Sequence, residues 1–149
     1  MMGVFDLIGT TGSGWLSDRF DNRGLLSMYY GLRGLSLLYL PSSTFSVYGL
    51  SLFAVFYGLD WIATVPPTVR LTATHFGRER VGVVYGWIYA SHMIGAAAAA
   101  WAGGFSRSTF DTYLPAFYGA GFACLIAAAA VWLIGSRQGA RERLIEARA

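Results

Sequence analysis

The sequence has little charge, no lysine and a single cysteine. Charged residues make up 13% of its 149 residues and hydrophobic residues 55%, whereas a water-soluble domain carries about 25% charged residues. This composition argues against a soluble globular domain. Cys124 excludes a disulfide within the chain and is expected to be a small packing residue. The basic residues are all arginines that flank apolar segments, and they form no basic recognition face, so nucleic acid is not an expected partner.

Five apolar segments follow one another along the chain. Their approximate bounds are 1–16, 24–40, 45–69, 81–104 and 113–135. The last three have the roughly 20 residues that cross a hydrocarbon core about 30 Å thick. The second segment is at the lower limit, and the first is shorter, as if the chain began inside a helix. We therefore predict an all-α membrane protein with five transmembrane helices over residues 1–135 and a basic cytoplasmic tail at 136–149.

The arginines predict how these helices are oriented. Short loops join the segments, so the helices alternate in direction, and Arg107 is then the one loop arginine on its side. The opposite side holds Arg19, Arg23, Arg70, Arg78, Arg80, Arg137, Arg141, Arg143 and Arg148. Because cytoplasmic loops are enriched in basic residues, we expect the C-terminus in the cytoplasm and the N-terminus on the opposite side.

Small residues predict where helices pack closely. Gly82 and Gly86 form a G-x-x-x-G spacing, and a run of alanines follows at 96–100. In lipid, small residues let two helix backbones approach each other. We expect a tight helix–helix contact at both places.

Four polar side chains lie inside the apolar segments: Asp6, Arg33, Asp60 and His92. An aspartate or arginine near the bilayer centre costs about 2.5–3.5 kcal/mol on an insertion scale. At about 1.5 Å per residue, all four lie close to the midplane. We predict a shared site for substrate or proton coupling, in which Arg33 attracts an anion and an aspartate carries the proton. The alternative is an arginine–aspartate pair that only holds helices together.

The loop after the first segment carries a recognisable motif. Residues 14–23 read GWLSDRFDNR, which resembles the G-x-L-x-D-R-x-x-x-R signature of the major facilitator superfamily. The matching positions are Gly14, Leu16, Asp18, Arg19 and Arg23. The resemblance implies a conformational latch, in which Asp18 meets the N-terminus of a neighbouring helix, whose dipole favours an anion. Here that helix would begin near Val81 and Gly82.

Further features resemble one half and one branch of this family. Five helices followed by a short basic tail are similar to helices eight to twelve, the C-terminal half. Residues 29–41 and 53–104 are similar to the monocarboxylate and oxalate/formate branch, where an aspartate stands eight residues before the signature glycine, as Asp6 does. That branch often has an arginine where this chain has Thr10. The resemblance implies alternating-access transport of a small organic anion, such as a monocarboxylate, with protons as a candidate co-substrate. It also implies a missing N-terminal half as partner.

Two other functions remain to be compared with transport. A small helical membrane scaffold or accessory subunit, without transport of its own, is the alternative. A hydrolase that uses Ser91 or Ser13 with His92 is disfavoured, because Ser91 and His92 are adjacent on one helix and cannot face each other. No enzymatic activity, cofactor or metal is therefore expected.

Overall fold

The computed structural model describes residues 2–43, 47–60 and 63–135, and every regular element in this part of the chain is a helix. The elements are α1 (Met2–Arg19), α2 (Asn22–Tyr39), η1 (Leu40–Ser42), α3 (Val47–Asp60), α4 (Val65–Phe76), η2 (Arg78–Arg80), α5 (Val81–Phe110), α6 (Leu114–Ala130) and η3 (Val131–Leu133). The all-α architecture predicted from the composition is confirmed.

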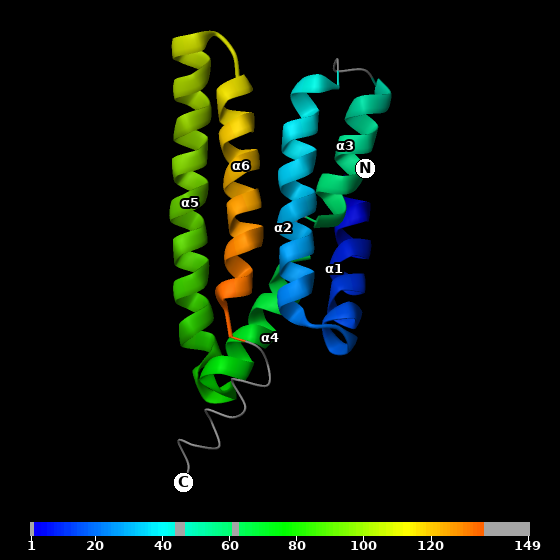
Figure 1. The fold of residues 1–149 in the computed structure, drawn as a ribbon, viewed down its shortest axis with the longest axis vertical. Helices are drawn as coiled ribbons and strands as arrows, with labels where there is room; N and C mark the ends of the chain where they lie inside the picture. Colours follow the sequence, from blue (N-terminus) through cyan, green and yellow to red (C-terminus); the bar gives the residue numbers. More distant parts are fainter. Residues whose placement is uncertain (1, 44–46, 61–62, 136–149) are drawn as a thin grey trace.

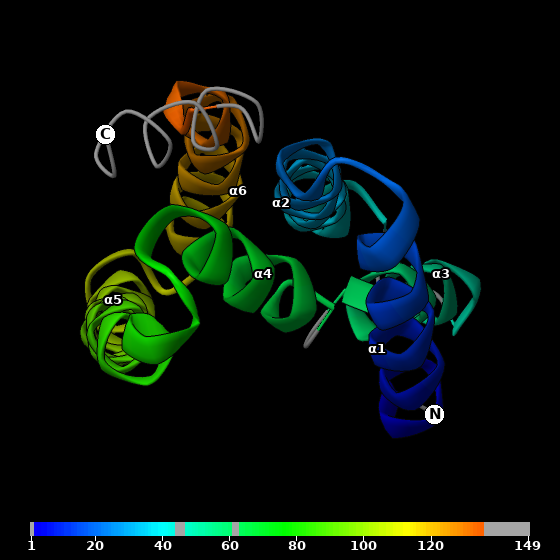
Figure 2. The same ribbon diagram turned by 90° about the horizontal axis from the view of Figure 1, so that it is seen from below.

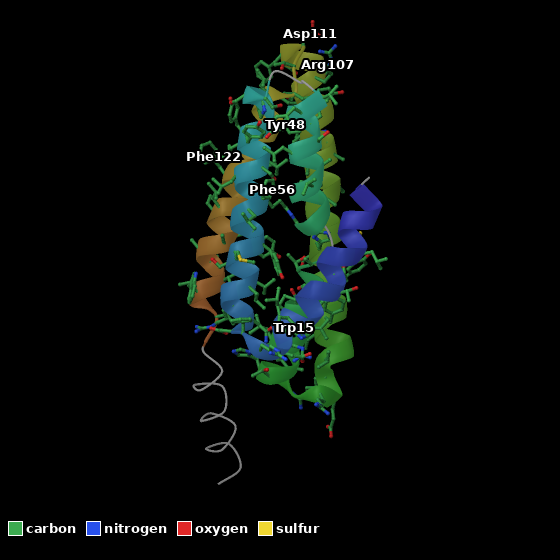
Figure 3. The ribbon with its side chains drawn as sticks, turned by 90° about the vertical axis from the view of Figure 1, so that its right-hand side faces the viewer. Trp15, Tyr48, Phe56, Arg107, Asp111 and Phe122 are labelled. Atoms are coloured by element: carbon green, nitrogen blue, oxygen red, sulfur yellow. The ribbon has the colours of Figure 1, made fainter. Side chains whose placement is uncertain are left out.

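The long helices run alternately up and down (Figure 1). α2 packs on α6, and α1 packs on α3. The short α4 crosses the lower end of the molecule between α1 and α5 (Figure 2). The links after α1 and α4 lie at this lower end, whereas Arg107 and Asp111 lie at the upper end (Figure 3). The arrangement thus separates Arg107 from the arginines at the ends of α1 and α4.

The predicted continuous helix at 45–69 is wrong. The described residues form α3, which ends at Asp60, and α4, which begins at Val65. Pro66 and Pro67 lack backbone N–H groups and so cannot donate to the carbonyls four residues earlier, which interrupts the helix. α4 then continues through the predicted loop at 70–80 as far as Phe76, where Gly77 ends it with a φ of 79°.

The predicted helix at 81–104 ends too early. α5 extends to Phe110 instead of residue 104, and the predicted loop at 105–112 shrinks to residues 111–113. Asp111 ends the helix in the left-handed region with a φ of 57°. Its carboxylate also lies 3.1 Å from the Arg107 guanidinium, one turn back. The polar end of this segment is therefore a helix terminus, not a loop.

The close helix contact lies elsewhere than predicted. A Cβ added at Gly82 or Gly86 would meet nothing within 4 Å, and the alanines at 96–100 are exposed. The tight contact is between α2 and α6: a Cβ added at Gly34 would lie 2.9 Å from the Gly121 carbonyl oxygen. Gly82 and Gly86 lack a facing helix among the described residues, whereas Gly34 and Gly121 face each other.

Burial follows the pattern of a membrane protein. The buried polar residues are Ser13, Ser17, Ser36, Ser43, Thr72 and Ser106. By contrast, Trp87, Ile94 and Trp101 of α5 are 75%, 72% and 71% exposed. Water-soluble monomers rarely expose large apolar surfaces of this kind. The outer surface of α5 is therefore suited to lipid or to another apolar partner.

Two helices in the described part are long and apolar enough to cross a membrane. They span Arg78–Phe110 and Leu114–Leu133, and Val47–Gly58 is an apolar but shorter helix. The predicted number of five crossing helices is therefore supported for two of them.

Candidate solute-binding site

A cavity of about 430 Å³ lies between α2, α4 and α5. It is lined by Tyr30, Arg33, Thr64, Val65, Thr68, Tyr85, Ile88, Tyr89, His92 and Met93. The five residues from α5 recur at intervals of three or four, so they occupy one face of that helix. The same helix thus offers a cavity wall on one face and exposed apolar side chains on the rest of its surface.

Arg33 and His92 line the same cavity although they are far apart in the sequence. Arg33 comes from α2, and its guanidinium carbon lies 5.9 Å from the centroid of the Tyr30 ring. His92 comes from α5, and its ring centroid lies 6.3 Å from that of Tyr89. An arginine side chain stays charged at all physiological pH values. Arg33 therefore places a guanidinium group next to the Tyr30 ring in the cavity wall.

The two aspartates of the predicted site cannot be placed in it. Asp6 belongs to α1 and Asp60 is the last residue of α3, but both side chains lie outside the described part of the structure. Their role in proton coupling stays a prediction.

The aromatic and hydroxyl groups of the cavity were missed from the sequence. Tyr30 precedes Arg33 by three residues, while Tyr85 and Tyr89 precede His92 by seven and three. These intervals place each tyrosine on the same helix face as its polar neighbour. Extending the site along the helical repeat would have found them.

The motif residue Asp18 has a different partner from the predicted one. It forms an ion pair with Arg70 of α4, and Arg70 also donates to the Ser17 carbonyl oxygen at 3.4 Å. The expected partner near Val81 and Gly82 is not reached, because α4 lies between α1 and α5 (Figure 2). The motif therefore joins α1 to α4.

The other motif residues differ in what they contact. Gly14 has open space around its Cα, and the Arg19 guanidinium lies 4.3 Å from the Trp15 ring centroid. Arg23 pairs with Asp21 at 3.1 Å and donates to the carbonyl oxygen of Ile134 at 3.0 Å. Arg23 therefore attaches the start of α2 to the chain that follows α6.

The serines considered for hydrolysis are engaged elsewhere. The Ser91 hydroxyl donates to the Ile88 carbonyl oxygen of its own helix at 2.8 Å. The Ser13 hydroxyl donates to the Ala63 carbonyl oxygen at 2.5 Å. Neither of these hydrogen bonds involves His92.

An all-α bundle with an apolar outer surface and a charged cavity between its helices is the architecture of a membrane transporter. The sequence model of the Major Facilitator Superfamily matches residues 1–149, and the chain belongs to this family of transporters.

Two curated proteins are similar to the chain. Monocarboxylate transporter 12-B of Danio rerio is 29% identical over 132 residues, which cover 84% of this chain and 27% of the relative. An uncharacterized MFS-type transporter of Bacillus subtilis (strain 168), YcxA, is 28% identical over 117 residues, or 75% of this chain and 29% of the relative. The chain thus spans less than a third of the length of either relative. No solved structure matches it significantly.

Proposed function

We propose that this chain is part of a carrier that moves a small organic anion, such as a monocarboxylate, across a membrane by alternating access. The observation that carries the proposal is the position of Arg33 in a cavity shared with His92. The similarity to a protein named as a monocarboxylate transporter supports the same class of solute.

The chemistry of the cavity suits a carboxylate. A guanidinium can donate two parallel hydrogen bonds to the two oxygens of one carboxylate. α4 begins at Val65, beside the cavity, so the positive end of its dipole also favours an anion there. Tyr30, Ile88 and Tyr89 supply apolar surface for the hydrocarbon part of the solute. An anion with a small apolar body therefore matches both parts of the lining.

The proposal also covers the partner half, the orientation in the membrane and the coupling proton. We propose that an N-terminal half, outside this chain, closes the cavity and that the arginine-rich lower end faces the cytoplasm. Asp6 or Asp60 then carries the coupling proton. The short length relative to both relatives supports a second half as partner.

Binding of L-lactate to the chain in lipid nanodiscs tests the proposal. We expect saturable binding to the parent chain and affinity that is about 10- to 100-fold lower for Arg33→Gln, since a hydrogen-bonded charge is removed. Arg107→Gln is the matched control, because Arg107 lies at the upper end, far from the cavity (Figure 3). Equal affinity of the Arg33→Gln variant and the parent would contradict the anion site. A stable chain with no saturable binding would contradict a solute site formed by this chain alone.

A further inference from the structure

A buried serine of α1 is bonded to the break between α3 and α4. The Ser13 hydroxyl donates to the Ala63 carbonyl oxygen at 2.5 Å. Ser13 and Ala63 are each 1% exposed, and Pro67 is also fully buried. Serine is mostly an exposed residue in proteins, so a buried serine bonded to another element calls for a specific reason.

Pro67 supplies that reason. In an α-helix the N–H of each residue donates to the carbonyl four residues earlier, so the donor for Ala63 would be residue 67. Proline has no N–H. The geometry for such a bond is otherwise present, because Thr64 is already helical and the next bond, from the Thr68 N–H to the Thr64 carbonyl oxygen, measures 3.2 Å. The Ser13 hydroxyl takes the place of the amide that Pro67 lacks.

α1 contacts α4 at a second point, five residues further along α1 and seven residues after Ala63. Arg70 pairs with Asp18, and the two side chains are 46% and 55% exposed. Between the two attachments, Thr64 and Thr68 line the cavity. None of the described lining residues belongs to α1 itself. α1 can therefore act on the cavity through α4.

We propose that Ser13 is a positioning residue for the solute cavity. Its bond to Ala63 fixes the first turn of α4, and so sets where Thr64 and Thr68 stand relative to Arg33. The Ser13–Ala63 bond is buried, whereas the Asp18–Arg70 pair is about half exposed, so the serine is the attachment that water does not reach. The solute in this inference rests on the proposed function; the attachment of α4 does not.

Hydrogen exchange of the chain in nanodiscs tests the attachment. Ser13→Ala is expected to speed exchange of the amides of residues 68–70 about five- to tenfold, because a buried carbonyl loses its donor. Ser13→Thr keeps a hydroxyl and is expected to exchange as the parent does. Ser27→Ala is the matched control, since it removes a hydroxyl-to-carbonyl bond of 2.9 Å between α2 and α6, away from α4. Unchanged exchange in Ser13→Ala, or the same increase in Ser27→Ala, overturns the inference.

A second variant tests the replacement of the proline amide. Pro67→Ala restores an N–H that can donate to Ala63 within the helix, so Ser13→Ala should then add little to the exchange rate. If Ser13→Ala alone does not fold, the comparison of Pro67→Ala with the Pro67→Ala, Ser13→Ala double variant still tests the inference. A full effect of Ser13→Ala in the Pro67→Ala background contradicts the inference.

L-Lactate affinity tests the positioning role. We expect Ser13→Ala to weaken binding several-fold and Ser13→Thr to match the parent. Faster exchange with unchanged affinity contradicts positioning. If the parent chain binds no L-lactate, the proposed function fails, while the exchange measurement still decides whether Ser13 holds α4.

Discussion

Among the described α-helices, α6 packs on α2 and on α5, and the two contacts differ sharply. α2 and α6 are far apart in the sequence, yet Gly34 and Gly121 bring their backbones into direct contact. Trp132, just beyond α6, donates to Ser27 of α2 at 3.1 Å. α5 and α6 are joined by a three-residue turn, but the glycines of α5 at 82 and 86 meet no neighbour within 4 Å. Adjacency along the chain does not produce the closer packing here.

The α2–α6 contact is tightly packed, whereas much of the surface of α5 is exposed. The α2–α6 contact is filled by backbone and by the Leu38 and Leu125 side chains, so it leaves no space for an added methyl group. α5 has the cavity on one face and exposed side chains such as Trp87 and Ile94 on the rest of its surface. In the proposed carrier, α2 and α6 form the closely packed pair and α5 lines the solute cavity.

The largest expected effect is at the α2–α6 contact. Gly121→Ala places a Cβ 2.7 Å from the Leu38 side chain, and such overpacking costs about 1–3 kcal/mol of stability. Gly86→Ala on α5 is the matched control and should change the free energy of unfolding little, because the added methyl group meets open space. Thermal unfolding in nanodiscs measures both. Equal losses in the two variants would show that α5 is packed as closely as α2.

A smaller effect is expected where Arg23 joins α2 to the end of α6. Its side chain is 16% exposed, it donates to Ile134, and its guanidinium lies 5.5 Å from the Trp132 ring centroid. Arg23→Gln should lower the free energy of unfolding by about 1–2 kcal/mol. Arg19→Gln removes an exposed side chain of the same motif that lies over the Trp15 ring of its own helix, so it should cost less. The reverse order in thermal unfolding would contradict the role of Arg23.

The smallest effect is expected at the Asp18–Arg70 pair. Both side chains are about half exposed, and exposed ion pairs contribute about 0–1 kcal/mol because water and salt screen them. Asp18→Asn should therefore change stability by less than about 1 kcal/mol, and the difference should shrink further at high salt. A loss as large as that of Gly121→Ala would contradict the weak contribution expected of an exposed ion pair.

Helices could be located from the sequence where apolar residues dominate a segment. Apolar runs located α2 and α6, because both segments are mostly apolar and end at polar residues. The break before α4 was missed as a boundary although Pro66 and Pro67 mark it, since the apolar run continues on both sides. The end of α5 was misplaced for the opposite reason: polar residues near Arg107 were taken for a loop, but the end of a membrane helix tolerates them.

The sequence indicated that Arg33 and His92 lie at similar distances along their helices, but it did not show which helices are neighbours. The positions of Arg33 and His92 along their helices indicated a common level, and the two residues do share a cavity. The partner of Asp18 was wrong, because a sequence shows how far a residue lies along its helix but not which helix lies beside it. Arg70 became the partner once α4 turned across the lower end of the bundle (Figure 2).

Thiol accessibility on α5 tests most directly whether a polar cavity lies inside an apolar exterior. In a Cys124→Ser background, His92→Cys and Ile94→Cys place one cysteine on the cavity face and one about 200° around the same helix. In nanodiscs, a charged, membrane-impermeant thiol reagent should modify residue 92 several times faster than residue 94, because water reaches the cavity and lipid covers the other face. Equal rates, or faster modification at residue 94, would contradict the account.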